Sequence, residues 1–283
     1  MNNLDLGKEM RKEIFLMARS GGIAHLASAF SLVEILIALY SKKVMSYDIA
    51  NPDWDGRDRL ILSKGHGSLA LYTALAHIGY LEKSELFTLL QPGSRLGCEP
   101  NIMDLPFVEA STGSLGHGLS IGVGMALALK SDGKDNHIYV IVGDGECQEG
   151  SIWEAIMSAA AFQLDNLCVI LDFNRIQKMD FVDNVLGITA WDDKFTCFGW
   201  SVKIADGHDA DDLAIKLLGE WEPMKPRVLI AKTIKGKGVS IMENVPSWHW
   251  RMPNKKELKV FMRELDITGE ELANADLHGA KLL

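Results

Sequence analysis

The sequence lacks the cysteine patterns that mark secreted or zinc-binding proteins. It contains four cysteines, Cys98, Cys147, Cys168 and Cys197, and no two of them form a CxxC pair. Their spacing predicts neither a disulfide framework nor a zinc site, and it favours a reducing, cytoplasmic location. The opening residues, MNNLDLGKEMRKEIF, contain no apolar run, so no signal peptide is expected.

Long hydrophobic runs and an excess of positive charge are also missing. The best candidate for a membrane span, residues 23–40, is interrupted by His25, by serines and by Glu34, so a buried helix is predicted there instead. The formal net charge of −9 provides no basic field that would attract nucleic acid or an anionic membrane. We therefore expect neither kind of partner.

The sequence does contain enough apolar residues for an independent core. The chain has 283 residues, of which 47% are hydrophobic and 24% charged, as in ordinary globular proteins. That length allows one large α/β domain or two small ones. No internal repeat, low-complexity tract or interdomain linker divides it, so we expect a single domain over residues 1–283 with a short helical C-terminal tail.

Predicted strands alternate with predicted helices along the chain. The strands are expected at residues 58–63, 137–142, 167–172, 200–205 and 227–233. Helices are expected at residues 5–20, 31–42, 68–79, 149–163, 191–198, 209–219 and 254–265, with another beginning near Ser114. Ser31 is the expected N-cap of its helix, with Glu34 completing a capping box. The runs IYVIV and LCVIL are apolar without alternation, which is typical of strands buried on both faces. The pattern predicts an α/β fold with a doubly wound, mostly parallel sheet and helices on both faces.

Polar residues follow two of these strands. Gly143-Asp144-Gly145 comes after the first apolar run, and Asn174 comes after the second. Ligands bind beyond the carboxyl ends of parallel strands, and carboxylate and amide oxygens suit Mg²⁺ or Ca²⁺ rather than zinc. A GDG triplet alone is usually only a turn. Here 28 residues separate Gly145 from Asn174, and this combination is the thiamine-diphosphate signature.

Six segments, in one order along the chain, carry a wider resemblance. They are DRLILSKGHGSLALYTALA, EASTGSLGHGLSIGVGMALA, GDGECQEGSIWEA, LDNLCVILDFNRIQ, FGWSVKIADGHD and KTIKGKGVSIMENVPSWH. The chain resembles the N-terminal half of a transketolase, of the kind encoded as a separate short subunit. The resemblance implies a thiamine-diphosphate-binding fold and a single domain of the type that binds the cofactor's diphosphate.

The resemblance also implies roles for individual residues. Asp144 and Asn174 would bind Mg²⁺ together with the Ile176 carbonyl, with Ca²⁺ or Mn²⁺ as substitutes. Cofactor contacts are implied for His66, Gly113, Ser114, Leu115, Gly145, Glu146, Glu149, Asn174 and His249. Of these, residues 113–115 would meet the aminopyrimidine, and Glu149 would lie where two cofactor sites touch. Catalytic positions are His25, His66, His249 and Glu99, and His25 would reach the hydroxyl groups of the substrate.

Plainer interpretations of the same residues stay open. His66 stands in a glycine turn, where a solvated histidine is common, and His25 lies in an apolar stretch typical of core histidines. His249 stands between Trp248 and Trp250, a setting that suits core packing equally well. The loop that begins at Lys235 could bind phosphate, but its Gly/Lys composition favours a solvated, flexible loop.

The resemblance covers only half of a complete cofactor site. In the family, the glutamate that activates the cofactor lies in a second, pyrimidine-binding domain, and about 30 residues after Pro253 are too few for one. We therefore expect an enzyme that is inactive alone and needs a separate C-terminal transketolase subunit, in an α₂β₂ assembly. The implied reaction moves a two-carbon ketol unit from a ketose (a phosphate or a modified sugar) to an aldose. Histidines with pKa values near 7 would relay protons.

Several positions depart from the family pattern. Family glycines are replaced at Ala27, Ser28 and Arg175, a glutamine at His117 and a small residue at Trp250. The most consequential change is Glu99, which stands where the family has a histidine facing the donor sugar. A carboxylate repels anionic groups and accepts hydrogen bonds from hydroxyls. We therefore expect an altered ketose donor or acceptor.

Three other functions are consistent with parts of the sequence. One is a different thiamine-diphosphate enzyme subunit, such as a 2-oxo-acid decarboxylase or dehydrogenase or a deoxyxylulose-phosphate synthase. Another is a non-catalytic, transketolase-like regulatory partner, which the changes near His25 and at Glu99 leave open. The intact Asp144, Asn174, His66 and His249 argue against it. A dinucleotide-binding enzyme is the weakest of the three, because the glycines from Gly116 to Gly122 have the wrong spacing.

Overall fold

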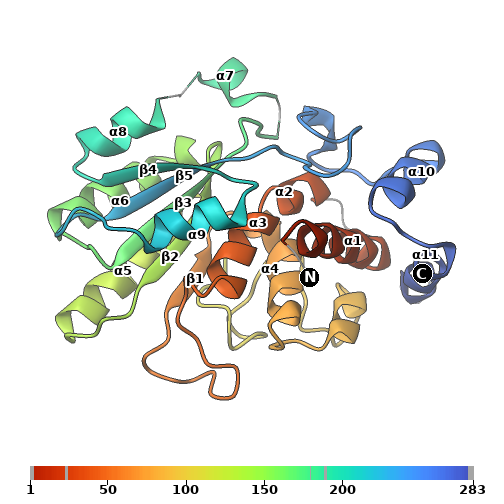
Figure 1. The fold of residues 1–283 in the computed structure, drawn as a ribbon, viewed down its shortest axis with the longest axis horizontal. Coiled ribbons are helices and arrows are strands. Elements are labelled where there is room, and N and C mark those ends of the chain that lie inside the picture. The colour runs from red at the N-terminus through yellow and green to blue at the C-terminus, as the bar shows by residue number, and fades with distance from the viewer. Residues whose placement is uncertain (1–2, 23–24, 179, 188–189, 280–283) are drawn as a thin grey trace.

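A five-stranded parallel sheet forms the centre of the molecule (Figure 1). The computed structural model describes residues 3–22, 25–178, 180–187 and 190–279. The strand order is β1-β2-β3-β5-β4, and each pair of neighbours is parallel. The strands are β1 (Arg59–Leu62), β2 (Ile138–Gly143), β3 (Leu167–Phe173), β4 (Ser201–Asp206) and β5 (Arg227–Lys232). All five predicted strands are confirmed to within one residue at each end.

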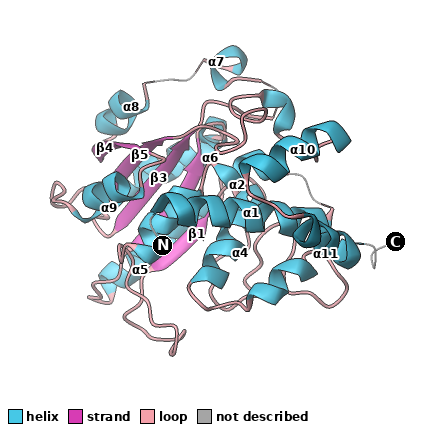
Figure 2. Ribbon diagram, turned by 45° about the vertical axis from the view of Figure 1, so that its right-hand side comes forward, coloured by secondary structure: helices cyan, strands magenta, loops and turns pink. Residues whose placement is uncertain are grey.

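Helices cover both faces of this sheet (Figure 2). The α-helices are α1 (Asn3–Gly21), α2 (Leu26–Phe30), α3 (Val33–Leu36), α4 (Ser68–His77), α5 (Gly118–Ser131), α6 (Gly150–Ala161), α7 (Val182–Val185), α8 (Trp191–Cys197), α9 (Ala210–Leu218), α10 (Lys255–Glu264) and α11 (Gly269–Gly279). Short 3₁₀ segments are η2 (Gly65–Gly67), η3 (Lys83–Thr88), η4 (Glu146–Gln148) and η5 (Pro246–Trp248), and η1 (Ile37–Ser41) is a π-helix. Of the described helices, none is long and apolar enough to cross a membrane.

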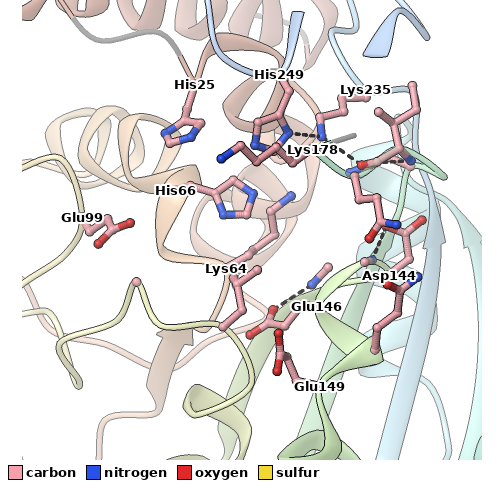
Figure 3. A pocket seen from close by; sticks show the side chains of 18 residues that line it. His25, Lys64, His66, Glu99, Asp144, Glu146, Glu149, Lys178, Lys235 and His249 are labelled. Atoms are coloured by element: carbon pink, nitrogen blue, oxygen red, sulfur yellow. Dashed lines mark hydrogen bonds between the residues drawn. The ribbon is translucent and has the colours of Figure 1, made fainter. Parts of the chain in front are cut away.

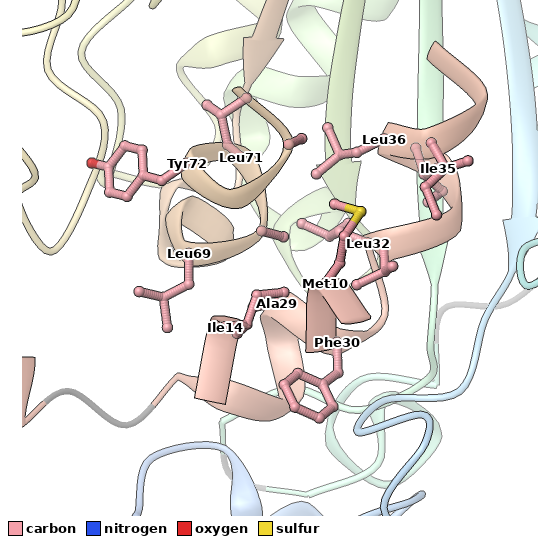
Figure 4. Close-up of a cluster of buried hydrophobic side chains, with 14 of the residues drawn as sticks. Met10, Ile14, Ala29, Phe30, Leu32, Ile35, Leu36, Leu69, Leu71 and Tyr72 are labelled. Atoms are coloured by element: carbon pink, nitrogen blue, oxygen red, sulfur yellow. The ribbon is translucent and has the colours of Figure 1, made fainter. Parts of the chain in front are cut away.

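Two hydrophobic cores lie on opposite faces of the sheet. Alternate residues of a strand point to opposite faces. Tyr139 and Ile141 accordingly join one core, with side chains from α1 to α4 and α9, and Val140 and Val142 join the other, with α5, α6 and α8. Figure 4 shows how closely α1 to α4 pack within the first core. The predicted doubly wound α/β architecture is therefore confirmed, with every strand parallel.

The predicted helix at residues 31–42 is replaced by two short pieces, α3 and η1, and its predicted capping box is wrong. Helix α2 ends before Ser31, and a short α3 then leads into the π-helix. The Ser31 hydroxyl contacts the Ser28 carbonyl at 3.1 Å and the Asp172 carboxylate at 2.8 Å, so it does not cap a helix. Glu34 accepts two hydrogen bonds of 2.7 Å from Arg11. Both side chains therefore form hydrogen bonds with buried residues of distant segments instead of with each other's backbone.

Two further boundaries differ from the prediction. Helix α5 begins at Gly118 rather than near Ser114, because Gly116 has a φ of +90° that a helix cannot contain. The tail contains α11 in addition to the predicted α10. This second helix packs along α1 through ion pairs from Lys12 to Glu271 and from Arg19 to Asp276.

Candidate active site

A cavity of about 320 Å³ lies at the carboxyl edge of the sheet (Figure 3). Its walls come from the turns after β1, β2 and β3, the loop before α5, and segments near both ends of the chain. Its lining includes these residues expected in the site: His25, His66, Glu99, Gly113, Leu115, Asp144, Gly145, Glu146, Glu149, Asn174, Ile176 and His249. Ser114 is exposed and is not among the lining residues.

Asp144 and Asn174 come together because β2 and β3 are neighbours in the sheet. Asp144 is 2% exposed and accepts hydrogen bonds from the backbone of Gly145 at 2.8 Å and of Arg175 at 2.5 Å. The Asn174 amide nitrogen donates a hydrogen bond to Asp172 at 2.9 Å. This bond distinguishes the amide nitrogen from the amide oxygen and so sets the orientation of the Asn174 side chain. Burial and the nearby carboxylate of Asp172 raise the pKa of Asp144 to about 7.

These residues fit a hard divalent cation. A buried carboxylate whose pKa is raised by burial gains stability when a cation binds beside it. The described residues hold no cluster of three His, Cys, Asp or Glu side chains suited to a metal, so a cation here would use amide and carbonyl oxygens as well. The backbone also permits a close approach, since a Cβ on Gly145 would lie only 2.9 Å from the Cβ of Gln177.

Beneath the predicted residues lies a buried ion pair that the sequence did not reveal. Lys64 follows β1 and forms a salt bridge with Asp172 of β3, and neither residue is more than 2% exposed. Asp172 also accepts hydrogen bonds from Ser31 at 2.8 Å and from the Thr233 hydroxyl. Burial acts to raise the pKa of Asp172, but Lys64 and these donors lower it overall. Asp172 therefore stays ionised within the core.

Lys235 is buried at the cavity, so the prediction of a solvated loop is wrong for this residue. It is 3% exposed, its ammonium donates to the Ile176 carbonyl at 2.9 Å, and it lies 3.0 Å from Nδ1 of His249. Burial and the charge of Lys64 lower the pKa of Lys235 to about 7. Lys235 reaches the cavity because it closely follows β5, whose carboxyl end lies at the same edge of the sheet as the site.

Three histidines from distant segments converge on the cavity. The ring of His25 lies 5.3 Å from that of His66 and 5.4 Å from that of His249, and the latter two rings are 5.7 Å apart. Burial and the charge of Lys235 lower the pKa of His25 to about 4 and that of His249 to about 3. Burial and Lys64 likewise place the pKa of His66 well below its usual range.

These low pKa values correct the expectation of histidines that titrate near pH 7. In this chain all three imidazoles are neutral at that pH, so each can accept or donate a hydrogen bond without carrying charge. The core-packing interpretation of the tryptophan-flanked segment applies to Trp248, which is buried against Phe261. His249, the next residue, faces the cavity.

Two of the departures from the family pattern, Glu99 and Trp250, lie at the cavity or beside one of its histidines. The Trp250 ring lies 4.1 Å from that of His25 in an edge-on arrangement and is 53% exposed. Glu99 packs against Gly113, where a Cβ would come within 2.0 Å of the carboxylate. Lys178 is an exposed cation that lines the same cavity. An acidic and a basic side chain therefore line the cavity, and an aromatic ring lies against His25.

Glu146 organises the loops around the cavity. Its carboxylate accepts hydrogen bonds from the backbone of Gly116 and Gly143, each at 3.0 Å, and from the hydroxyl of Ser63. These donors follow β1, precede α5 and end β2, so a single buried side chain holds three segments together. Glu149, by contrast, is exposed at the start of α6.

The fold and this cavity together define a thiamine-diphosphate-binding domain of the transketolase class. The model of the family "Transketolase, thiamine diphosphate binding domain" matches residues 15–270, so the chain belongs to this family. The resemblance seen in the sequence is thereby confirmed.

Comparison with known proteins places the chain among the short transketolase subunits. It is 39% identical to the 6-deoxy-6-sulfo-D-fructose transketolase subunit SqwG of Clostridium sp. (strain MSTE9), over 88% of this chain and 90% of that protein. It is also 39% identical to a subunit of apulose-4-phosphate transketolase from Phocaeicola vulgatus, over 92% and 91% of the two proteins. The chain is therefore the N-terminal subunit of a two-chain transketolase.

Single-chain transketolases share the same domain within a longer protein. Human transketolase is 34% identical over 92% of this chain but only 41% of its own length. The crystal structure of Pichia stipitis transketolase in complex with sedoheptulose-7-phosphate superposes with a TM-score of 0.84 at 25% identity. That match covers 99% of this chain and 44% of the Pichia chain.

Proposed function

We propose that this chain supplies the metal and diphosphate half of a ketol-transferring site that a second subunit completes. The observation that carries the proposal is the meeting of Asp144, Asn174 and three histidines around a single cavity. Mg²⁺ is the proposed cation, bound by Asp144, Asn174 and the Ile176 carbonyl, with Ca²⁺ or Mn²⁺ as substitutes. We also propose that residues 1–283 form one domain and act in the cytoplasm.

When bound, thiamine diphosphate supplies the nucleophilic carbon that attacks a ketose carbonyl and carries the two-carbon unit to an aldose. The residues of this chain hold and orient the reactants. Neutral His25 and His249 can accept a proton from a sugar hydroxyl and return it, because neither carries a charge at pH 7. The buried Lys64–Asp172 pair keeps Asn174 oriented beneath the cofactor.

We propose that the substrate is a ketose with uncharged hydroxyl groups beside Glu99 and an anionic group at its far end. The Glu99 carboxylate would accept hydrogen bonds from hydroxyls and repel a nearby phosphate. Lys178, exposed on the same cavity, would attract a terminal phosphate or sulfonate. The names of two relatives, which specify apulose-4-phosphate and 6-deoxy-6-sulfo-D-fructose, support a sugar of this chemical class.

We propose that the partner subunit carries the pyrimidine-binding domain and that two copies of each chain assemble as α₂β₂. An exposed apolar surface on α5 and α6 supports self-association. It includes Ile121, Gly124 and Met157, and both helices are apolar on nearly every side. A helix of that composition is normally buried, so this surface fits an interface between chains.

The decisive experiment is a calorimetric titration of thiamine diphosphate with Mg²⁺ into this chain, with and without its partner subunit. Tight binding only in the presence of the partner, followed by ketol transfer in a screen of donor sugars, is the expected result. Turnover of pyruvate by the pair would instead favour a 2-oxo-acid enzyme. A folded complex that binds no cofactor would favour the non-catalytic, regulatory interpretation.

A further inference from the structure

A second cavity, of about 360 Å³, lies at the edge of the sheet opposite the candidate active site. His137 and Asn166 directly precede β2 and β3, Arg227 is the first residue of β5, and all three line this cavity. We propose that the cavity binds a small organic phosphate that carries hydroxyl groups. The inference goes beyond the proposed function and does not depend on it, because it uses none of the active-site residues.

The parallel sheet brings the three side chains together. β2, β3 and β5 are neighbours, and all begin at the same edge of the sheet. The amide of Ile138 donates to the Asn166 carbonyl at 2.8 Å, which holds the starts of β2 and β3 together. Arg227 is paired in register with Cys168, two residues after Asn166. The three side chains therefore stand on adjoining strand ends, which fixes the spacing of their backbones.

Arg227 contributes a positive charge that has no partner among the described residues. Its half-buried guanidinium forms no ion pair or hydrogen bond with any of them, and its Nε atom is buried without an acceptor. Buried polar groups of proteins are almost always paired, so this guanidinium marks a place for a further partner. Its parallel N–H groups match two oxygens of a phosphate. An anion is therefore the partner that this side chain requires.

The other charges of the cavity do not cancel that of Arg227. The remaining titratable residues that line it are Lys130, Lys134, Asp135, His137 and Asp165. Asp165 is already paired with Lys130 at 2.7 Å, and Asp135 is exposed, so water screens its charge. Burial lowers the pKa of His137, so its imidazole is neutral at pH 7 and can donate a hydrogen bond without adding charge. An incoming anion would thus pair with Arg227 and meet no unscreened carboxylate.

Asn166 gives the reason to expect a hydroxyl group on the ligand. Its amide nitrogen donates to the Ala126 carbonyl at 3.0 Å, while its amide oxygen is buried and accepts no hydrogen bond from a described residue. A hydroxyl beside the phosphate would supply the donor that this oxygen lacks. The cavity volume of about 360 Å³ falls within the usual range for small-molecule sites, about 300–1,000 Å³, so a short carbon chain fits as well as a phosphate.

The test is a calorimetric titration of glycerol 3-phosphate into this chain, with hydrogen exchange to locate the binding. The wild type should bind glycerol 3-phosphate at least fivefold more tightly than propyl phosphate, which has no hydroxyl on its carbon chain. Binding should slow amide exchange at residues 133–138 and 165–168. Arg227→Met removes the guanidinium but keeps a long side chain, and it should weaken binding at least tenfold. Arg227→Gln is a second variant with the same expected result if the methionine variant melts at a lower temperature.

Two control variants should bind glycerol 3-phosphate as the wild type does. Arg59→Met changes an arginine that also begins a strand at this edge but interacts with Glu109 and is not among the residues that line the cavity. Lys178→Met removes the exposed cation of the candidate active site. A loss of binding in Lys178→Met but not in Arg227→Met would place the phosphate in the active site and overturn the inference.

Three other results would also overturn it. They are the absence of binding to the wild type, equal binding to the wild type and to folded Arg227 variants, and tighter binding of D-glycerate than of glycerol 3-phosphate. Equal affinities for glycerol 3-phosphate and propyl phosphate would refute the role of Asn166. None of these results bears on cofactor binding or ketol transfer, so the proposed function is tested separately.

Discussion

Lys64, which lines the cavity, forms an ion pair with Asp172 in the interior of the protein. Their side chains are 2% and 0% exposed. Asp172 touches Asn174, so this one carboxylate both neutralises a buried lysine and orients a proposed metal ligand. Folding stability and cofactor binding are therefore linked at a single residue.

Asp172→Asn should destabilise the protein strongly, because it leaves the Lys64 ammonium buried without a counter-charge. Breaking a buried pair in this way costs about 3–5 kcal/mol of the free energy of unfolding. Urea denaturation of the folded chain measures the loss. The control is Asp165→Asn, which breaks the surface pair with Lys130 and should cost less than about 1 kcal/mol. Equal effects of the two variants would contradict the prediction.

Asp144→Asn should abolish metal-dependent cofactor binding while leaving the fold intact. The change removes the only charged ligand proposed for the cation and keeps an acceptor oxygen for one of the two backbone donors, Gly145 and Arg175, which bond to different oxygens of Asp144. Even indirect neighbours of metal ligands typically alter affinity by about 10–100-fold, so a larger loss is expected here. Calorimetry with Mg²⁺ and thiamine diphosphate measures it. Asp180→Asn, which changes a carboxylate bonded to Asn184 at the surface of the following loop, should bind normally.

Glu34 should contribute stability that disappears in acid. Burial opposes its ionisation, but the hydrogen bond with His208 and the charge of Arg11 lower the pKa of Glu34 to about 2. A carboxylate with a lowered pKa stabilises the fold fully above its ordinary pKa of 4.5, and this contribution is lost as the pH falls from there through 2. A shift of that size corresponds to about 3 kcal/mol, since one pKa unit is worth about 1.4 kcal/mol.

Denaturation of Glu34→Gln between pH 2 and 7 tests this dependence. The variant should be several kcal/mol less stable than the wild type at pH 7, and the difference should shrink below pH 4. The surface variant Glu85→Gln, which loses an exposed pair with Arg95, should differ from the wild type by less than about 1 kcal/mol. A pH-independent difference for Glu34→Gln would refute the assignment.

Glu99 and Trp250 should set the sugar preference of the complex. Glu99→His removes the carboxylate beside the cavity, so ketoses with an anionic group nearer the reacting carbon should gain in kcat/KM. Trp250→Gly removes the ring that lies against His25, and should raise KM for the preferred sugar with little change in kcat. Steady-state kinetics over a series of ketose phosphates and sulfonates measures both. No change in donor preference in Glu99→His would eliminate this explanation.

The apolar surface on α5 and α6 should hold chains together. Met157→Glu introduces a charge into that surface and should weaken assembly, measured as a lower sedimentation coefficient by analytical ultracentrifugation. Met157 is 50% exposed in the isolated chain. Ile215→Glu is the control, since Ile215 is 71% exposed but lies on α9, across the sheet. If both variants assemble as the wild type does, another surface forms the interface.

The sequence predicted the sheet and the meeting of Asp144 with Asn174 because both depend on local patterns. Apolar runs define buried strands, and parallel neighbours bring their carboxyl ends together. Lys64, Asp172 and Lys235 could not be recognised in the same way, because a lysine becomes buried only through partners from other segments. A weak signal was present: Lys64 comes two residues after a buried strand, and Asp172 is the last residue but one of an otherwise apolar strand.

The helix broken around Ser31 was missed for a related reason. Its sequence has the spacing of a capping box, but Ser31 bonds to Asp172 and Glu34 bonds to Arg11. The local capping hydrogen bonds do not form, because a buried unpaired charge costs far more free energy than a helix without a cap.

The histidine cluster can form only when nearly the whole chain is present. His25 follows the first helix and His249 precedes the last two, so the cavity forms only after nearly the whole chain has been synthesised. Contacts between such distant segments form late in folding, because a long loop must close before they can be made. The cofactor and the proposed cation would therefore bind finished chains in preference to nascent ones. The proposed partner subunit, which would complete this site, would bind only chains in which the segments around His25 and His249 have already come together.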